Sequence, residues 1–318
     1  MYYIGIDLGG TNIVAAVVDD KYEILGTGKI KTDLPRSADL IFDDMAQAAR
    51  IAVENSGLSM DQIEYVGVGA PGTVNPHTGY IEFSNNLEFD HLPAREMLET
   101  RLNKKVYLGN DANCAALGEA YAGCGHGVKN FVAVTLGTGV GSGIILDGKI
   151  VTGVNYAGGE CGHMIINVDG EPCTCGRHGC WEAYASATAL IRQTKVAMGE
   201  NPDSYMWQLV KENNGKVSGR TAFDAMRNGD KAGKEVVERY IKYVATGIVN
   251  LINALQPEII CIGGGICNEG DALLIPLREY IYKCRYSKFS QDQTQLLKAE
   301  LGNNAGIIGA ALLGITNN

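Results

Sequence analysis

The chain contains no apolar stretch that approaches the roughly 18 residues needed to cross a bilayer. It also lacks a basic N-terminal region followed by an apolar segment and a cleavage site, because a strand-like segment begins at about Tyr3. The sequence therefore predicts neither a membrane span nor export, and we expect a cytoplasmic protein with no membrane partner.

Positive charge is scarce. Lys and Arg together number 27, against 36 Asp and Glu, so the formal net charge is −9. Binding of nucleic acid depends on clustered Lys and Arg that neutralise phosphates, and this balance argues against a nucleic-acid partner. A small anionic substrate would instead need local positive groups, which backbone N–H groups can supply.

A paired cysteine framework is also missing. The chain has nine cysteines, an odd number, and five of them lie outside the single cluster described below. These five are Cys114, Cys124, Cys261, Cys267 and Cys284. Such scatter fits a reducing cytoplasm better than a disulfide scaffold.

A chain of 318 residues, of which 46% are hydrophobic and 20% charged, is long enough for a buried core and two modest domains. Its first thirty residues predict three strands, 3–7, 13–19 and 24–31, with a glycine-rich turn at 9–12. These elements predict an antiparallel meander.

The same pattern recurs later in the chain. Strands are predicted over 131–136, 142–146 and 149–152, with a glycine-rich turn at 137–141 and a tight Asp147-Gly148 turn. Two copies of one unit, each with a Thr in its glycine turn, suggest a duplicated architecture, and chance similarity of two hairpins is the alternative. A domain boundary near residue 120 rests on this duplication alone, since no linker or low-complexity tract separates the halves.

Strands and helices alternate along the rest of the chain. Helices are predicted over 37–55, 112–121, 182–198, 221–228, 232–255 and 305–313, and strands over 65–69, 105–109 and 258–262. Gly57 is a helix stop, and Asn110 with Asp111 is a helix start. This alternation indicates an α/β fold.

Three glycine-rich turns follow strand-like runs. The first contains Asp7, Gly9, Gly10, Thr11 and Asn12, the second Gly137, Thr138 and Gly139, and the third Gly263, Gly264 and Gly265. One such turn proves little, but three let backbone N–H groups approach phosphate oxygens closely, with Thr hydroxyls as further donors. Nucleotide phosphates are the predicted ligand.

Two other phosphate-binding motifs are excluded by their context. Residues 67–72 have the glycine spacing of a dinucleotide-binding turn, but Pro71 and Pro76 preclude the helix that should follow. Residues 143–149 have the Walker spacing, but Ile150 follows where Ser or Thr is needed and the run leads into a strand.

Polar side chains stand at two predicted strand ends. Asp7 faces the first glycine turn, where its carboxylate could hold Mg²⁺ directly or through water, or simply cap the turn. Asn110 and Asp111 would suit a sugar hydroxyl, because the amide can bond one oxygen while the carboxylate accepts the proton of the nucleophile. Capping of a helix is the structural alternative for this pair, and the two roles are compatible.

One short run concentrates metal ligands. Three cysteines within eight residues, and a histidine ten residues upstream of the first, can surround a tetrahedral ion, and zinc is the natural candidate. These residues are Cys173, Cys175, Cys180 and His163. Cys161 and His178 are further candidates, so spacing alone leaves other quartets open, and a disulfide or unrelated buried thiols are the alternatives.

Two glutamates flank the same run. Glu160 and Glu182, together with His163, could direct carboxylates and an imidazole at further hydroxyls of a substrate. Exposed glutamates are more often solvated surface, so spacing alone does not decide between these interpretations.

In their order along the chain, these motifs resemble the ROK family of sugar kinases and related repressors, within the actin and hexokinase superfamily. The resemblance rests on Asp7–Asn12, Ala70-Pro71-Gly72, Asn85-Asn86, Asn110-Asp111, Leu136–Gly141, Glu160-x-Gly162-His163, the run from Cys173 to Glu182, and Gly263-Gly264-Gly265. It covers about residues 4 to 314. The departures are Cys161, where an apolar residue is common, and Ser142, where Gly is usual.

The resemblance implies a duplicated, ribonuclease H-like two-domain fold with the active site in a cleft between the domains. The expected domains are 1–119 with 303–318, carrying the first phosphate turn, and 120–302, carrying the second turn and the zinc loop. Family members commonly pair, so a homodimer or homotetramer is expected.

The resemblance also implies phosphoryl transfer from ATP, with Mg²⁺, to a hexose hydroxyl. The sequence of residues 176–186 resembles the family's glucose kinases most, so the 6-hydroxyl of glucose is the implied acceptor. Asp111 is then the general base. The implied sugar contacts are Gly72, Asn86, Asn110, Asp111, Glu160, His163 and Glu182. The implied ligands of a structural Zn²⁺ are His163, Cys173, Cys175 and Cys180.

Other functions stay open at this point. N-acetylmannosamine kinases and fructokinases share most of these motif residues, so a kinase of N-acetylmannosamine, N-acetylglucosamine, fructose or mannose is an alternative, and a non-catalytic sugar-binding regulator is a further one. A repressor of this family carries a DNA-binding module ahead of the first strand. Three expectations argue against a repressor: the first strand starts at about Tyr3, a basic face is absent, and Asp111 is present.

Overall fold

The computed structural model describes residues 1–316, and this part of the chain separates into two compact units. The first contains Met1–Ala133, Gly143–Gly159 and the chain from Ala299 onward, and the second contains Val134–Ser142 and Glu160–Lys298. The domain boundaries expected from the resemblance, near 119 and 303, stay a proposal, and residues 317 and 318 of that expected first domain lie outside the described residues.

A five-stranded sheet forms the centre of the first unit. Its strands are β1 (Tyr2–Leu8), β2 (Asn12–Asp19), β3 (Ile24–Lys31), β4 (Ile63–Ala70) and β8 (Val106–Asn110), in the order β3-β2-β1-β4-β8. The first three pair antiparallel, as the predicted meander requires, while β4 lies parallel to both β1 and β8.

Helices cover both faces of this sheet. Helix α1 (Ala38–Ser56) buries Ile41, Phe42 and Met45 in the core of one face. It ends at Gly57, which adopts a φ of 73°, a left-handed conformation that glycine enters without strain. The predicted helix and its stop are confirmed.

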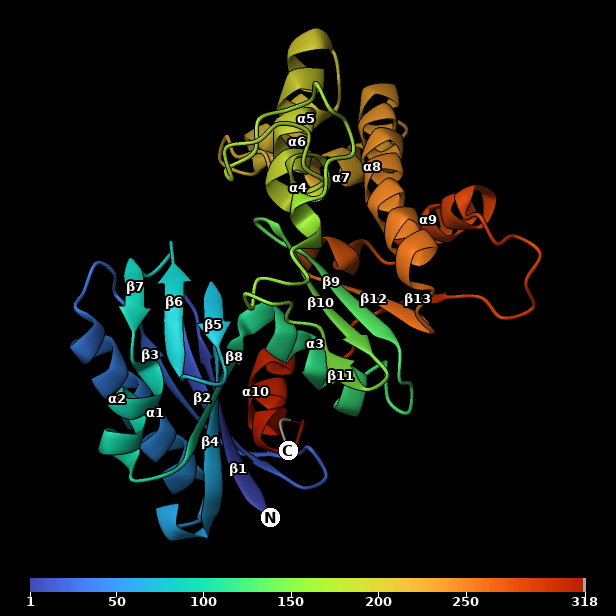
Figure 1. Ribbon diagram of the computed structural model, residues 1–318. Helices are drawn as coiled ribbons and strands as arrows, with labels where there is room; N and C mark the ends of the chain where they lie inside the picture. The colour runs from blue at the N-terminus through green and yellow to red at the C-terminus, as the bar shows by residue number, and fades with distance from the viewer. Residues whose placement is uncertain (317–318) are drawn as a thin grey trace. The chain divides into compact units, whose positions relative to one another are not determined.

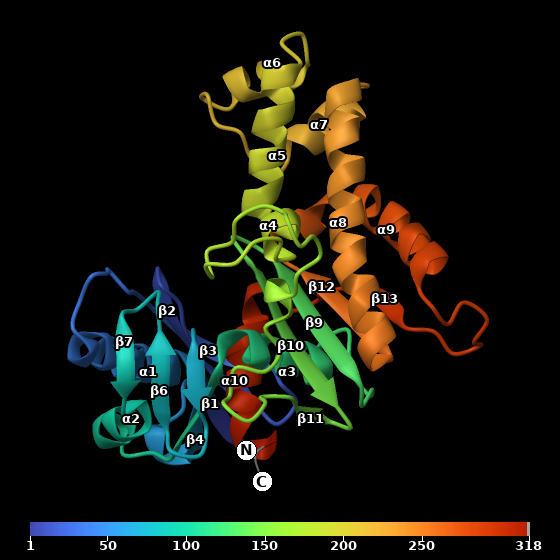
Figure 2. The same ribbon diagram turned by 45° about the horizontal axis from the view of Figure 1, so that its top comes forward.

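The other face is covered by α3 (Asp111–Ala122) and α10 (Ala305–Thr316), which lie side by side in both views (Figure 1, Figure 2). Helix α10 approaches the strands very closely. A Cβ atom on Gly5 would lie 1.9 Å from the carbonyl oxygen of Ile307, and one on Gly67 would lie 1.8 Å from that of Ala310. Glycine is therefore required at both positions, so Gly67 has a packing role instead of a dinucleotide-binding one.

The sequence analysis missed part of the first unit. Strands β5 (Thr73–Asn75), β6 (Tyr80–Ser84) and β7 (Phe89–Leu92) form a small antiparallel sheet, and helix α2 (Ala94–Leu102) follows it. These strands have three to five residues each, too few to show a clear alternation of apolar and polar residues.

The second five-stranded sheet repeats the plan of the first. Its strands are β9 (Phe131–Leu136), β10 (Val140–Leu146), β11 (Lys149–Ile150), β12 (Ile259–Gly263) and β13 (Gln295–Lys298), in the order β11-β10-β9-β12-β13. Counted along the chain, both sheets have the order third, second, first, fourth, fifth. The predicted duplication is thereby confirmed.

The hairpin between β10 and β11 has the predicted turn. Asp147 and Gly148 adopt φ values of 49° and 74°, and positive values at both central positions match the right-handed twist of paired strands. Strand β11 is shorter than predicted, because only Lys149 and Ile150 pair with β10.

Helices dominate the second unit. They are α4 (Glu182–Ala185), α5 (Ala187–Glu200), α6 (Met206–Glu212), α7 (Thr221–Arg227), α8 (Lys231–Leu255) and α9 (Asp271–Cys284), and short 3-10 turns lie at Met60–Gln62, Cys161–His163, Gly265–Glu269 and Gly302–Asn304. The prediction of one helix over 182–198 is wrong. Ser186 is extended, with ψ of 161°, and its hydroxyl accepts a hydrogen bond from the backbone N–H of Ala189, which starts a new helix.

Helices α6 and α9 and strand β13 were not predicted. Pro276 interrupts the helical pattern of α9, and β13 has four residues. No helix within residues 1–316 combines the length and the apolar character that a membrane crossing requires.

Candidate active site

Asn110 and Asp111 stand where β8 ends and α3 begins. The Asn110 side chain caps the helix, because its Oδ1 accepts a hydrogen bond from the backbone N–H of Asn113 at 3.1 Å. Its Nδ2 donates to the carbonyl oxygen of Gly72 at 3.0 Å. One side chain thus fixes both the start of α3 and the turn after β4.

Gly72 cannot be replaced without disturbing this turn. Its φ is 100°, and an added Cβ would lie 2.1 Å from the carbonyl oxygen of Phe83. Asn86, the other residue assigned to this part of the sugar site, is exposed, and within residues 1–316 no hydrogen bond joins it to Asn110 or Gly72. The structure therefore ties Gly72 to Asn110, the residue before Asp111, and the role of Asn86 stays a proposal.

The carboxyls of Asp7 and Asp111 interact within the first unit. Burial and the charge of Asp111 raise the pKa of Asp7 to about 6. Burial also raises the pKa of Asp111, while the backbone N–H of Ala112, which donates to Asp111 Oδ1 at 2.8 Å, acts in the opposite direction. Two partly buried carboxyls with raised pKa values can share a cation or accept a proton.

The first glycine turn joins β1 and β2. The backbone N–H of Gly9 donates to the carbonyl oxygen of Asn12 at 3.0 Å, and Gly10 and Thr11 are exposed. Thr32, a fully buried residue that the sequence analysis missed, donates its hydroxyl to the carbonyl oxygen of Gly9 at 2.6 Å. The sequence does not reveal this contact, because Thr32 comes beside the turn only through the pairing of β2 with β3.

The second glycine turn, residues 137–139, joins β9 and β10 in the second unit. The backbone N–H of Val140 donates to Glu182 Oε2 at 2.9 Å, and a Cβ on Gly139 would lie 2.3 Å from the same oxygen. The turn is also held from α5, because the Thr188 hydroxyl donates to the carbonyl oxygen of Thr138 at 2.8 Å.

The third glycine turn lies against the end of β9. Gly264 has a φ of 96°, and a Cβ there would lie 2.3 Å from the carbonyl oxygen of Leu136, the residue before the second turn. The second and third turns, which are far apart in the sequence, are therefore neighbours in space. Backbone N–H groups of two adjacent turns suit the phosphates of one nucleotide.

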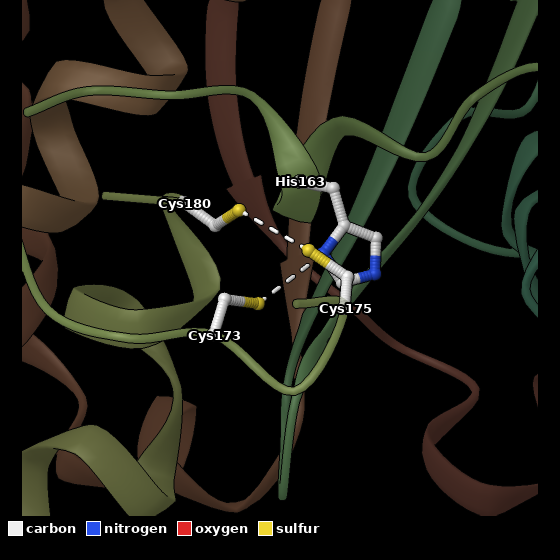
Figure 3. Close-up of side chains that lie close together, drawn as sticks. All are labelled: His163, Cys173, Cys175 and Cys180. Atoms are coloured by element: carbon white, nitrogen blue, oxygen red, sulfur yellow. Dashed lines mark hydrogen bonds between the residues drawn. The ribbon is translucent and has the colours of Figure 1, made fainter. Parts of the chain in front are cut away.

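The four predicted metal ligands lie together in the second unit (Figure 3). The ligand atoms of His163, Cys173, Cys175 and Cys180 are all within 4.8 Å of one another. Cys161 and His178 are not part of this group: the backbone N–H of Cys161 bonds Ser142 Oγ, and His178 forms a bridge with Pro172. Within residues 1–316 all nine cysteines are free, so the disulfide alternative is wrong here.

The spacing of the four ligands fits a tetrahedral zinc ion. Bonds of about 2.3 Å to sulfur and about 2.05 Å to nitrogen place two sulfurs about 3.8 Å apart and a sulfur and a nitrogen about 3.6 Å apart. The distance from Cys175 Sγ to Cys180 Sγ is 3.6 Å, and that from Cys173 Sγ to His163 Nδ1 is also 3.6 Å. A hydrogen bond from the backbone N–H of Arg177 lowers the pKa of Cys175 to about 6, which favours the thiolate that a metal needs.

The other nitrogen of His163 points away from the sulfurs in Figure 3. Nδ1, by contrast, faces the cysteines, at 3.6 Å from Cys173 Sγ. Glu160 precedes the short turn that carries His163 and is exposed.

The end of the cysteine-rich loop is fixed in the core of the second unit. Trp181 is fully buried, and its Nε1 donates to the carbonyl oxygen of Tyr243 in α8 at 2.8 Å. Gly247 permits this contact, since a Cβ there would lie 2.0 Å from the indole ring. The next residue, Glu182, is thereby held in place.

Comparison with known proteins gives concordant matches along the whole chain. A family model described as the ROK family matches residues 3–317. The glucokinase of Halalkalibacterium halodurans is 36% identical over 313 residues, which cover 98% of this chain and 94% of the relative. The N-acetyl-D-glucosamine kinase of Pasteurella multocida is 30% identical over 326 residues, which cover 97% of this chain and 98% of the relative.

A solved structure agrees in fold as well as in sequence. The ROK family glucokinase from Streptomyces griseus, crystallised with glucose and AMPPNP, has a TM-score of 0.82 and 34% identity, and the match covers 98% of this chain and 99% of that one.

The repeated sheet order and the glycine turns define an actin- and hexokinase-like protein of the duplicated two-domain type. Within that class, the chain belongs to the ROK family.

Proposed function

We propose that this ROK sugar kinase transfers the terminal phosphoryl group of ATP to the 6-hydroxyl of glucose. The observation that carries the proposal is the partly buried Asp111 carboxyl at the start of α3, beside an Asn110 that is tied to Gly72. The relatives support glucose as the substrate, because a glucokinase is 36% identical and a glucokinase structure with glucose and AMPPNP shares the fold.

Asp111 is the proposed general base. Its raised pKa keeps the carboxyl basic enough to accept the proton of a sugar hydroxyl as that hydroxyl attacks the phosphoryl group. Gly72, Asn86, Asn110, Glu160, His163 and Glu182 are the proposed sugar contacts. Among these, Asn110 already forms hydrogen bonds within the protein through both its Nδ2 and its Oδ1. Its proposed role is therefore to position Gly72 and Asp111 in addition to binding a sugar hydroxyl.

The three glycine turns are the proposed phosphate and adenosine contacts, comprising Gly9, Gly10, Thr11, Asn12, Gly137, Thr138, Gly139, Gly263, Gly264 and Gly265. Asp7 is the proposed contact for Mg²⁺, which would neutralise charge on the phosphates. Asp7 and Asp111 are partly buried carboxyls, the charge of Asp111 raises the pKa of Asp7, and a divalent cation would stabilise such a pair.

His163, Cys173, Cys175 and Cys180 are the proposed ligands of a structural Zn²⁺. Four protein ligands leave no open position for water, so the ion would shape the site and take no part in the chemistry. It would fix the His163 ring through Nδ1 and leave the other nitrogen for a sugar hydroxyl. We further propose a cytoplasmic homodimer or homotetramer, as the family resemblance implies.

An N-acetylglucosamine kinase is the second candidate, because one such relative is 30% identical over nearly the full length of both chains. ADP release with ATP and Mg²⁺, measured on glucose, mannose, fructose, N-acetylglucosamine and N-acetylmannosamine, separates the candidates. The highest kcat/KM on glucose is the expected result. Preference for an N-acetylated sugar would keep the mechanism and replace the substrate, and no turnover on any sugar would contradict the kinase.

A further inference from the structure

The groove between α9 and β13, in the second unit, is a candidate binding site that the proposed kinase reaction does not use. Its volume is about 800 Å³, within the usual range of small-molecule sites. Three cations line it, Arg278, Lys283 and Arg285, and the only carboxylate among its lining residues is Glu279. In a chain with a net charge of −9, this groove is locally positive.

Arg285 is a buried cation without a counter-charge. Its residue surface is 7% exposed, and it is the only Lys or Arg that is buried within residues 1–316. Its Nε has no hydrogen-bond partner, and no carboxylate of the described residues forms an ion pair with it. The buried carboxylates are satisfied by contrast, since Glu269 pairs with Arg227 and Glu119 accepts from the backbone N–H of Leu301.

Local structure explains why a cation is tolerated here but not why its Nε is unpaired. Arg285 directly follows the last residue of α9, where the helix dipole favours positive charge. The guanidinium carbon also lies 4.8 Å from the centre of the Tyr282 ring, a favourable cation–π distance. Neither interaction accepts a hydrogen bond in the guanidinium plane, and buried charged groups normally have such a partner.

The opposite wall of the groove is a sheet edge. Strand β13 is last in the sheet order, and its Leu296 carbonyl oxygen accepts hydrogen bonds from Arg278 Nε at 3.2 Å and Nη2 at 2.9 Å. These bonds fix the Arg278 side chain across the groove. Leu296 and Leu297 add an apolar wall beside the cations.

We propose that this groove binds a phosphorylated small molecule. Its phosphoryl oxygens accept hydrogen bonds from Arg285 and Lys283, and its carbon part packs against Tyr282 and Leu297. A bare phosphate ion would leave most of the volume and the apolar wall unused, so the groove selects a phosphate ester over inorganic phosphate.

This site is separate from the glycine turns. Helix α9 begins soon after Gly265, whereas the groove lies along its last two turns. The 14 residues of α9 span about 20 Å, so the groove and the third glycine turn stand near opposite ends of the helix.

Isothermal titration calorimetry on the full-length protein tests the proposal without requiring turnover. Glucose 6-phosphate, fructose 1,6-bisphosphate and inorganic phosphate are titrated in the presence of saturating AMPPNP and glucose. We expect at least one sugar phosphate to bind more tightly than inorganic phosphate. Its Kd should rise at least tenfold in Arg285→Met, which keeps the apolar stem, and severalfold in Lys283→Met.

Lys288→Met is the matched control, because it removes the same charge from the adjoining exposed loop and does not line the groove. Its Kd should equal that of the wild type. Circular dichroism checks the fold of Arg285→Met. If that variant is unfolded, the Kd of Lys283→Met, a substitution at an exposed position, tests the proposal instead.

The proposal is overturned if no probe binds the wild type, if binding survives loss of the groove cations, or if Lys288→Met loses binding equally. ADP release is measured separately on the same variants, so failure of this site and failure of the kinase assignment are distinguishable.

Discussion

Glu182 accepts a hydrogen bond from the backbone N–H of Val140 through Oε2, at 2.9 Å, while its Oε1 lies 3.8 Å from Cys173 Sγ. One carboxylate therefore connects the second glycine turn to the cysteine cluster. Because Glu182 is also a proposed sugar contact, the phosphate turn and the metal loop of the second unit are expected to influence sugar binding through it.

Gly139→Ala tests this connection. The added Cβ would lie 2.3 Å from Glu182 Oε2, so the carboxylate must move. We expect the Kd for glucose, titrated without nucleotide, to rise about tenfold, equivalent to about 1.4 kcal/mol.

Gly137→Ala is the control in the same turn, because its Cβ would meet no atom within 4 Å. Its affinity for glucose in the absence of nucleotide should match the wild type. Equal weakening in both variants would show that the turn as a whole, and not the position of Glu182, determines sugar binding.

Removal of one cysteine ligand should remove the metal. We expect about one zinc per chain in the wild type by elemental analysis, and almost none in Cys175→Ala, because three ligands no longer close the tetrahedral site. The Kd for glucose should rise at least tenfold in parallel, since His163 loses its anchor.

Cys284→Ala is the matched control for this experiment, as Cys284 is a free, exposed cysteine outside the cluster. It should keep its zinc and its glucose affinity. A zinc-free wild type with normal glucose affinity would refute the structural role of the metal.

The raised pKa of Asp7 predicts a pH-dependent gain in stability for Asp7→Asn. A carboxyl whose folded pKa is about 6, above its ordinary value of 3.8, contributes stability below the ordinary value and loses it as the pH rises through about 6. Without divalent cations, the variant should therefore match the wild type near pH 4 and exceed it by about 2–3 kcal/mol above pH 7 as an upper bound.

Urea unfolding at several pH values measures this difference. Asp90→Asn, at an exposed position of β7, is the control and should show no such trend. A constant difference between Asp7→Asn and wild type across the pH range would contradict a raised pKa of Asp7.

Sequence reasoning succeeded where a local pattern has a single physical solution. The Asp147-Gly148 turn, the Gly57 stop and the Asn110 cap each depend on neighbouring residues alone, and all three are confirmed. A short span of chain also limited the candidates for the metal cluster, but spacing left Cys161 and His178 open, and the grouping of His163 with the three cysteines came from the family resemblance and agrees with the structure.

It failed where tertiary contacts decide. The break at Ser186 is set by side-chain capping inside a run of good helix formers. The bond from Thr32 to Gly9 and the neighbourhood of Gly264 and Leu136 depend on how strands pair across the fold. The unpaired Arg285 likewise becomes visible only when its burial is known.

The kinetics of Asp111→Asn test the central claim most directly. The variant keeps the shape and the polar atoms of the side chain but removes the base, so with glucose, ATP and Mg²⁺ we expect kcat to fall about 10²–10⁴-fold. The Kd for glucose, measured by titration, should change by less than about threefold, a free-energy difference of about 0.65 kcal/mol. A kcat within about threefold of the wild type, with glucose still bound, would contradict the assignment of Asp111 as the base of this reaction.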